Sequence, residues 1–138
     1  MLFLTLNQHF HQLLINECLS CNITEYKKIV SEFYESTLNQ IFLLRILSTK
    51  VQRLIKIKES EDKLSTIDNL INSIKPAIFW KEKPIVKKQL LIWNIHQLNK
   101  IINEINSVEL LCKKNPDISN SIFFGFFSKI CFKSNNFS

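Results

Sequence analysis

The chain has 138 residues, of which 46% are hydrophobic and 22% are charged, the composition of one compact globular domain. Gly125 is the only glycine, and this excludes doubly wound sheets, β-barrels and phosphate-binding loops, because their turns need several glycines. The formal net charge of +6 suggests an acidic partner. The excess of Lys, Ile, Asn and Phe is also typical of an AT-rich genome, so the charge by itself identifies no partner.

The apolar segments are too short for a membrane protein. No run of about 18 apolar residues occurs. The apolar start of the chain lacks a basic segment, and polar residues interrupt it from Asn7 onward, so it does not have the pattern of a signal peptide. We therefore expect a cytoplasmic protein that does not associate with membranes.

Apolar spacing and helix-capping residues predict an all-α fold, a bundle of about six to seven helices without a strand. Asn94 with Gln97 forms the clearest capping box, and Asp117 or Ser119 is expected to cap the last helix. The predicted domain covers residues 1–132, and residues 133–138 are expected to form a polar tail. In chain order the expected helices cover residues 6–17, 22–34, 37–61, 65–75, 84–93, 94–115 and 117–130.

No catalytic motif is present in the sequence. The patterns of phosphate-loop enzymes, zinc proteases, zinc deaminases and serine hydrolases do not occur. Cys18 and Cys21 form a C-x-x-C pair behind His9 and His11, but the glycine or proline of a zinc knuckle is missing. We expect reduced cysteines near a helical core, with no metal, no cofactor and no catalytic residue, and hence no enzyme activity of the chain on its own.

One segment combines two prolines, two adjacent aromatic residues and several lysines. Exposed aromatic side chains beside basic ones can stack on nucleic-acid bases, or they can anchor a protein interface. Alternatively, Phe79 and Trp80 fill a gap between two helices. The sequence leaves these readings open, and the candidate contacts to a partner or to DNA are Lys75, Phe79, Trp80, Lys81, Lys83, Lys87 and Lys88.

The same segment belongs to a series of motifs that covers roughly residues 42–130. In order, these are LLRIL at 43–47, QRL at 52–54, KPAIFWK at 75–81, QL at 89–90, Trp93, Leu98, Glu109 and CK at 112–113. Their order and spacing resemble the C-terminal collar domain of the delta subunit of the bacterial DNA polymerase III clamp loader, in its alphaproteobacterial form. Ala77 stands where this family often has a second proline, and residues 59–65 lack the glycine that it often carries.

The resemblance implies a role in DNA replication as the collar alone, without the AAA+ nucleotide-binding-like domain that grips the clamp. The implied partners are other clamp-loader subunits, a separate chain with the missing N-terminal domains, and primer-template DNA. Such a fragment would belong to a DNA-directed DNA polymerase holoenzyme. The apolar run at residues 122–127 predicts a subunit interface at Phe123, Phe124, Phe126 and Phe127, unless these residues close the chain's own core.

Two alternatives to the collar interpretation remain open at the level of sequence. The chain can be a free-standing helical nucleic-acid-binding protein that uses Trp80 and the lysines of residues 75–88. It can also be a non-functional remnant of a split delta-subunit gene, in which case the fold would persist without a partner.

Overall fold

A computed structural model describes residues 2–33, 39–61, 66–134 and 137, and for residues 2–9 it describes the backbone alone. Within these ranges the chain contains α-helices, one short 3-10 turn and no strand, which confirms the predicted all-α class. None of the helices in the described part is both long and apolar enough to cross a membrane.

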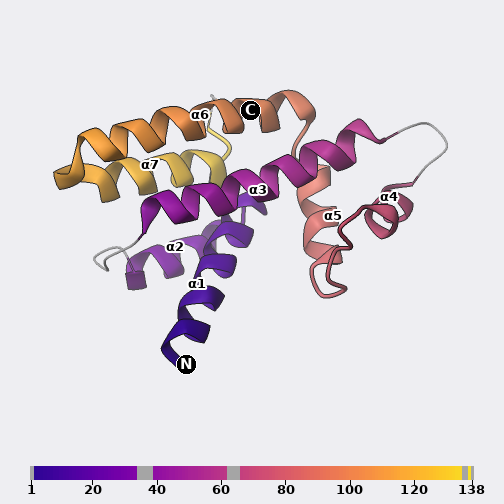
Figure 1. The fold of residues 1–138 in the computed structure, drawn as a ribbon, viewed down its shortest axis with the longest axis horizontal. Coiled ribbons are helices and arrows are strands. Elements are labelled where there is room, and N and C mark those ends of the chain that lie inside the picture. The colour runs from indigo at the N-terminus through magenta and orange to yellow at the C-terminus, as the bar shows by residue number, and fades with distance from the viewer. Residues whose placement is uncertain (1, 34–38, 62–65, 135–136, 138) are drawn as a thin grey trace.

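Five helices form the body of the molecule and two form an arm at its side (Figure 1). In the body, α3 and α6 lie side by side, α7 packs against α6, and α1 and α2 pack against α7. In the arm, α4 packs on α5, and α5 contacts α3. The bounds are α1 (Leu2–Leu19), α2 (Ile23–Phe33), α3 (Gln40–Glu59), α4 (Ile67–Ser73), α5 (Lys83–Ile92), α6 (Ile95–Lys114) and α7 (Ser119–Cys131), with a 3-10 turn at Pro116–Ile118.

Side-chain caps fix several helix starts, and one predicted cap is wrong. The predicted capping box is confirmed, because Asn94 Oδ1 accepts from the Gln97 amide at 2.8 Å and Gln97 Oε1 accepts from the Asn94 amide at 3.0 Å. Neither Asp117 nor Ser119 caps α7 with its side chain. The 3-10 turn leads directly into α7, and the Ser119 hydroxyl donates to the Pro116 carbonyl instead. The predicted starts at residues 37 and 65 lie outside the described residues.

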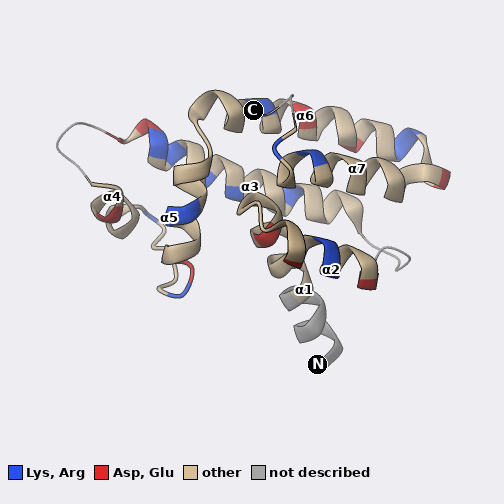
Figure 2. Ribbon diagram, turned by 180° about the vertical axis from the view of Figure 1, so that it is seen from behind, with Lys and Arg blue, Asp and Glu red and all other residues tan. Residues whose placement is uncertain are grey.

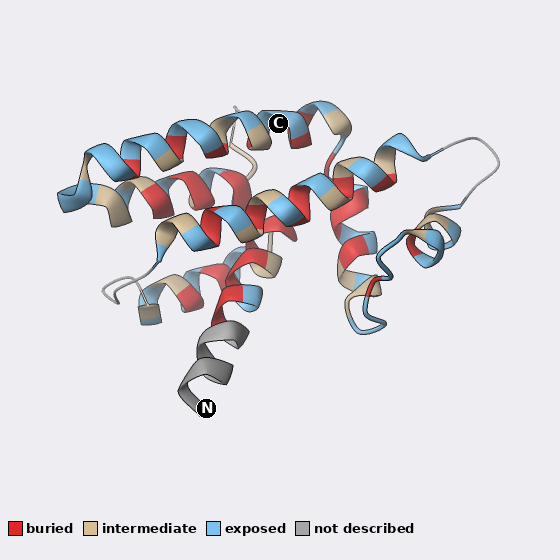
Figure 3. Ribbon diagram, viewed as in Figure 1, coloured by how far each residue is buried: buried red, intermediate tan, exposed pale blue. Residues whose placement is uncertain are grey.

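The four phenylalanines predicted to form a subunit interface lie in the core instead. Each of these four side chains is at most 4% exposed in the folded chain. Figure 3 shows buried residues on the side of α7 that faces the neighbouring helices. The reason is that α1, α2 and α6 all pack against α7. The prediction is therefore corrected: Phe123, Phe124, Phe126 and Phe127 close the chain's own core and have no free surface for a neighbour.

The predicted polar tail at residues 133–138 is also corrected, as far as it is described. Phe137 is fully buried, and its ring lies 6.5 Å from the ring of Phe126. Lys133 Nζ donates to the Ile92 carbonyl at 3.1 Å and lies 4.8 Å from the centre of the Trp93 ring. An isolated phenylalanine among polar residues gives no periodic signal, so the sequence did not predict this return to the core. Lys133 and Phe137 therefore both pack against the body of the fold.

Gly125 offers a direct test of how α7 is packed. It lies on the exposed side of the helix without a positive φ, and a Cβ atom built on it would meet nothing within 4 Å. Gly125→Ala should therefore stabilise the protein by about 1 kcal/mol, because alanine has the higher helix propensity. The reverse change at an exposed position of α6, Lys100→Gly, should destabilise it by roughly 0.7 kcal/mol. Urea denaturation measures both, and a destabilised Gly125→Ala variant would show that this side of α7 is covered.

Candidate interaction site

The loop between α4 and α5 buries one residue and exposes the next two. Ile78 is 5% exposed, whereas Phe79 and Trp80 are 58% and 67% exposed. The loop closes with a turn in which the Glu82 amide donates to the Phe79 carbonyl at 2.9 Å. Ile78 therefore fills the gap between the helices, and Phe79 and Trp80 are left available to a partner. Of the readings that the sequence left open, the gap-filling one does not hold for these two aromatic side chains.

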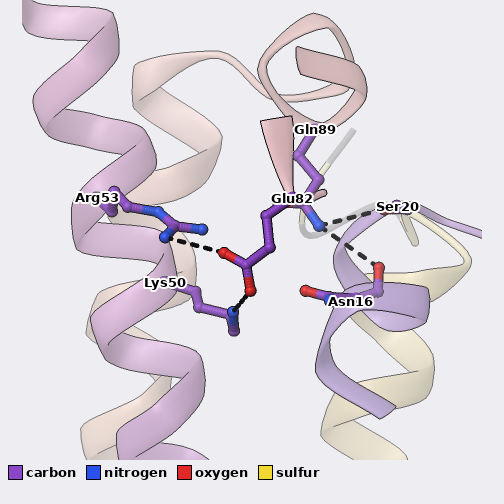
Figure 4. A network of polar contacts seen from close by, with 6 residues as sticks. All are labelled: Asn16, Ser20, Lys50, Arg53, Glu82 and Gln89. Carbon is purple, nitrogen blue, oxygen red and sulfur yellow. Dashed lines mark hydrogen bonds and ion pairs between the residues drawn. The ribbon is translucent and has the colours of Figure 1, made fainter. Parts of the chain in front are cut away.

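Glu82 ties this loop to the central helix (Figure 4). Its two carboxylate oxygens lie 3.8 Å from Lys50 Nζ and 3.5 Å from Arg53 Nη1, and both cations belong to α3. Lys50 is only 8% exposed. Burial lowers the pKa of Lys50 because it penalises the charged ammonium, and Glu82 opposes this effect. The carboxylate thus compensates a buried charge and holds the loop in place at once.

The other end of α5 is fixed to α1 by two further polar side chains. Gln89 Nε2 donates to Ser20 Oγ at 3.2 Å, as Figure 4 also shows. The indole of Trp93 is buried, and its Nε1 donates to the Leu19 carbonyl at 2.8 Å. Together with Glu82, these contacts hold the helix that follows the aromatic loop at both of its ends.

The structure separates the predicted basic residues of this segment into three groups. Lys75 and Lys81 are exposed in the loop, and Lys81 Nζ lies 5.4 Å from the centre of the Trp80 ring. Two lysines face α4, because Lys83 Nζ donates to Asn72 Oδ1 at 2.7 Å and Lys87 Nζ contacts Asp68 Oδ2 at 3.2 Å.

Lys88 points to another part of the molecule, where its Nζ donates to Asn22 Oδ1 at the α1–α2 turn. Figure 2 likewise shows basic residues distributed over several helices. The structure therefore brings together Phe79, Trp80 and Lys81, with Lys75 exposed at the start of the same loop. It does not bring Lys83, Lys87 and Lys88 into this group.

Sequence reasoning missed the two residues that anchor the loop, Lys50 and Glu82. A signal for Lys50 was present, because it lies three residues after Leu47 and one before Val51, on the edge of the apolar stripe of the central helix. A lysine at such a position requires a counter-charge from another element. The sequence alone did not indicate that the counter-charge would come from residue 82.

None of the four cysteines forms a disulfide bond, and Cys18, Cys21 and Cys131 lie beside or within α7. Cys18 Sγ donates to the Phe127 carbonyl at 3.3 Å, and Cys21 Sγ lies 3.9 Å from the Ile130 carbonyl. Among the described residues no group of three His, Cys, Asp or Glu side chains could hold a metal ion, and the side chain of His9 lies outside them. His11 instead packs its ring edge-on against Phe42, with ring centres 5.3 Å apart.

Comparisons of the chain with protein-family models, with curated proteins and with solved structures found no match. The function of the chain is therefore inferred from the geometry of the loop and its anchors and from the motif series.

The buried thiols and one phenol make the stability depend on pH. Burial raises the pKa of Cys131 to about 12, and it also raises the pKa values of Cys18 and Tyr26. The unfolded chain releases these protons from about pH 9 upward whereas the folded chain keeps them. Each such group should therefore lower the free energy of unfolding by up to about 1.4 kcal/mol per pH unit above that point.

Urea denaturation between pH 7 and 10.5 checks this expectation, and stability should fall across the upper half of that range. The lowered pKa of Lys50 acts in the opposite sense, because the folded chain releases that proton first. Cys131→Ala should make the decline shallower by removing one of the raised groups. A stability that is constant up to pH 10.5 would contradict the expectation.

The anchor at Glu82 can be tested with a change that keeps its shape. Glu82→Gln leaves Lys50 buried without a full counter-charge, and we expect a loss of about 1 to 2 kcal/mol, less than for a fully buried pair because Glu82 is partly exposed. Glu61→Gln removes an exposed carboxylate that lies 4.0 Å from Lys58 Nζ, and it should cost roughly 0 to 0.5 kcal/mol. Equal losses in the two variants, measured by urea denaturation, would rule out a special role for Glu82.

Proposed function

We propose that the chain is a non-catalytic assembly module of a DNA polymerase III clamp loader, and that Phe79 and Trp80 contact a neighbouring subunit. The observation that carries the proposal is the display of two exposed aromatic side chains between a buried Ile78 and an anchored Glu82. Tryptophan is among the residues most enriched in the energetically dominant positions of protein interfaces. The collar-like motif series is what connects the module to the clamp loader.

Pre-organisation supports a role of the loop in binding. Ordering a flexible loop on association costs free energy, and a loop that is already held in its bound shape avoids that cost. Here Ile78 fixes the loop by burial, and Lys50 and Arg53 fix it through Glu82. The two aromatic side chains are thus exposed on a loop that is held on both sides of them, which is the arrangement that an interface anchor requires.

Residues shared with the collar motif series have a consistent place in this arrangement. Arg53 binds Glu82, Gln89 binds Ser20, and Trp93 binds the Leu19 carbonyl. These are contacts that hold the arm on the body. The most conspicuous part of the series, residues 78–80, contains the buried plug and both exposed aromatics. The series thus combines residues that position the loop with residues that the loop presents.

A second candidate function is the binding of nucleic acid by the same loop. Lys81 lies beside the Trp80 ring and Lys75 is exposed, so a base could stack on the indole while lysines contact phosphates. Against it, Lys83 and Lys87 are engaged with α4, and Lys88 lies elsewhere. Of the five predicted lysines, this leaves Lys75 and Lys81 to contact phosphates, and so small a number of cations favours contact with a protein over contact with nucleic acid.

Capture of the other clamp-loader subunits of the same organism tests the proposal. The tagged chain should copurify with at least one of them, and Phe79→Ala with Trp80→Ala should weaken this binding by about 30-fold or more, as expected for a central interface anchor. Leu91→Ala is a matched control, because Leu91 is 68% exposed but lies outside the loop. The free energy of unfolding should be the same in all variants within about 0.5 kcal/mol, because the changes are on the surface.

The same variants separate the two candidate functions. A nucleic-acid binder would bind a labelled primer-template in fluorescence anisotropy with an affinity that falls steeply between 50 and 200 mM salt, and Lys75→Gln with Lys81→Gln would weaken it. Copurification that is insensitive to the aromatic changes would exclude the loop as the interface. Capture of no loader subunit at all would exclude the assembly role, as expected for a gene remnant.

A further inference from the structure

A groove of about 540 Å³ runs along α3 beside α1, and its lining includes neither Phe79 nor Trp80 of the aromatic loop. Its two ends differ in chemistry. Phe42 and Ile46 form an apolar end, and Lys50 and Arg53 form a basic end. Arg45 lies beside the apolar end, Thr49 lies between the two ends, and Gln12 of α1 completes the lining. A volume of this size is that of a small-molecule site.

The cations of this groove outnumber the carboxylates that contact them. Lys50 and Arg53 share the single carboxylate of Glu82. Arg45 shares Glu109 with Lys113, at 3.9 and 3.5 Å respectively. Three cations thus line the groove, and only two carboxylates contact them, one of which is shared with Lys113 of α6; this side of α3 therefore carries a net positive charge. The contact of Arg45 is also long, and its side chain is 74% exposed, so this guanidinium is free to turn toward a ligand.

The basic end shows a second sign of an incomplete set of partners. Arg53 Nε is buried and has no hydrogen-bond partner among the described residues. Lys50 is nearly fully buried, with Glu82 as its ion-pair partner at 3.8 Å. Burial lowers the pKa of Lys50, since this counter-charge does not make up for the lost hydration. A further anion at this end would compensate both groups.

We propose that the groove binds a small phosphate monoester with an apolar or planar body. The phosphate would contact Lys50 and Arg53 from the groove, beside the Glu82 carboxylate that already contacts both cations. Lys50 and Arg53 are three residues apart and so lie on neighbouring positions of the helix surface. A phosphate monoester carries close to two negative charges at neutral pH, so it is attracted to this net positive charge, and the guanidinium fork of Arg53 fits its oxygens better than a point charge does. Along the helix axis, Ile46 lies roughly 6 Å from Lys50 and roughly 10 Å from Arg53, at 1.5 Å per residue.

The body of the ligand would therefore extend along the groove and contact Ile46 and Phe42. Phe42 is 47% exposed, so its ring is available for this contact. The Thr49 hydroxyl already donates to the Arg45 carbonyl at 3.0 Å, and its oxygen remains available as an acceptor. This site is separate from the proposed subunit contact at Phe79 and Trp80, and it does not depend on that proposal.

Titration of the folded chain with phenyl phosphate, followed by amide shifts in two-dimensional NMR, tests the site. Saturable shifts should be centred on residues 42–53. Inorganic phosphate should shift the residues around Lys50 and Arg53 with lower affinity, and phenol should shift neither end saturably. An absence of saturable shifts in α3 with phenyl phosphate would overturn the proposal, and so would equal binding of phenol.

Three variants test which end of the groove contacts the phosphate and which end contacts the body of the ligand. Arg53→Gln should weaken both phosphate probes by about tenfold or more, as expected when a charge-assisted hydrogen bond is lost. Arg45→Gln removes an exposed charge without touching Glu82, so it reports on the site even if Arg53→Gln unfolds. We expect it to weaken phenyl phosphate by roughly threefold, the smaller effect of an exposed cation. Phe42→Ala should weaken phenyl phosphate and leave inorganic phosphate unchanged.

Lys100→Gln is the matched control for charge, because it removes one exposed cation from α6, outside the groove. It should leave both affinities unchanged. If Lys100→Gln weakens binding as much as Arg45→Gln does, the attraction comes from the net charge of the protein and the site is disproved.

Discussion

Burial of α7 is the constraint around which the other helices are arranged. At about 100° per residue, its four buried phenylalanines span an arc of roughly 160°, wider than the apolar stripe of an ordinary surface helix. One neighbour cannot cover such an arc. The structure covers it with α6 on one side and with α1 and α2 on the other. Polar contacts follow the same geometry, since the Tyr26 hydroxyl lies 2.9 Å from Ser128 Oγ and Cys18 reaches the Phe127 carbonyl. The body is therefore closed by contacts between the two ends of the chain.

Local pattern predicted the helices well because each depends on residues close together in sequence. The apolar spacing of the central helix and the capping box at Asn94 are examples, and both are found in the structure. Contacts between residues that are far apart in sequence were not predictable from such patterns. Leu111 continues the apolar stripe of α6, yet it is 47% exposed, because α7 turns back on the side of Cys112. Likewise, no pattern indicated that Phe137 would return to the core or that Glu82 would meet Lys50.

The candidate interaction site shows the same division. The sequence singled out the loop in which the structure exposes two aromatic side chains, because prolines, aromatics and lysines coincide there. It did not distinguish Ile78, which is buried, from Phe79 and Trp80, which are exposed. That distinction comes from the anchoring of the loop on α3. One face of α3 thus has two tasks, since Lys50 and Arg53 both hold the loop through Glu82 and line the groove beside α1.

The closure of the two ends on each other also bears on how the chain is made. A ribosome releases α1 and α2 before α7, and their partners in α7 lie about a hundred residues later, as in the contacts from Cys18 to Phe127 and from Tyr26 to Ser128. At roughly 5 to 20 residues per second, these helices wait for many seconds with their apolar sides uncovered. During that interval Leu14, Ile15 and Leu19, all fully buried in the end, are accessible to chaperones. In this fold, α1 and α2 are synthesised before α7, but their apolar sides are covered only after α7 has been synthesised.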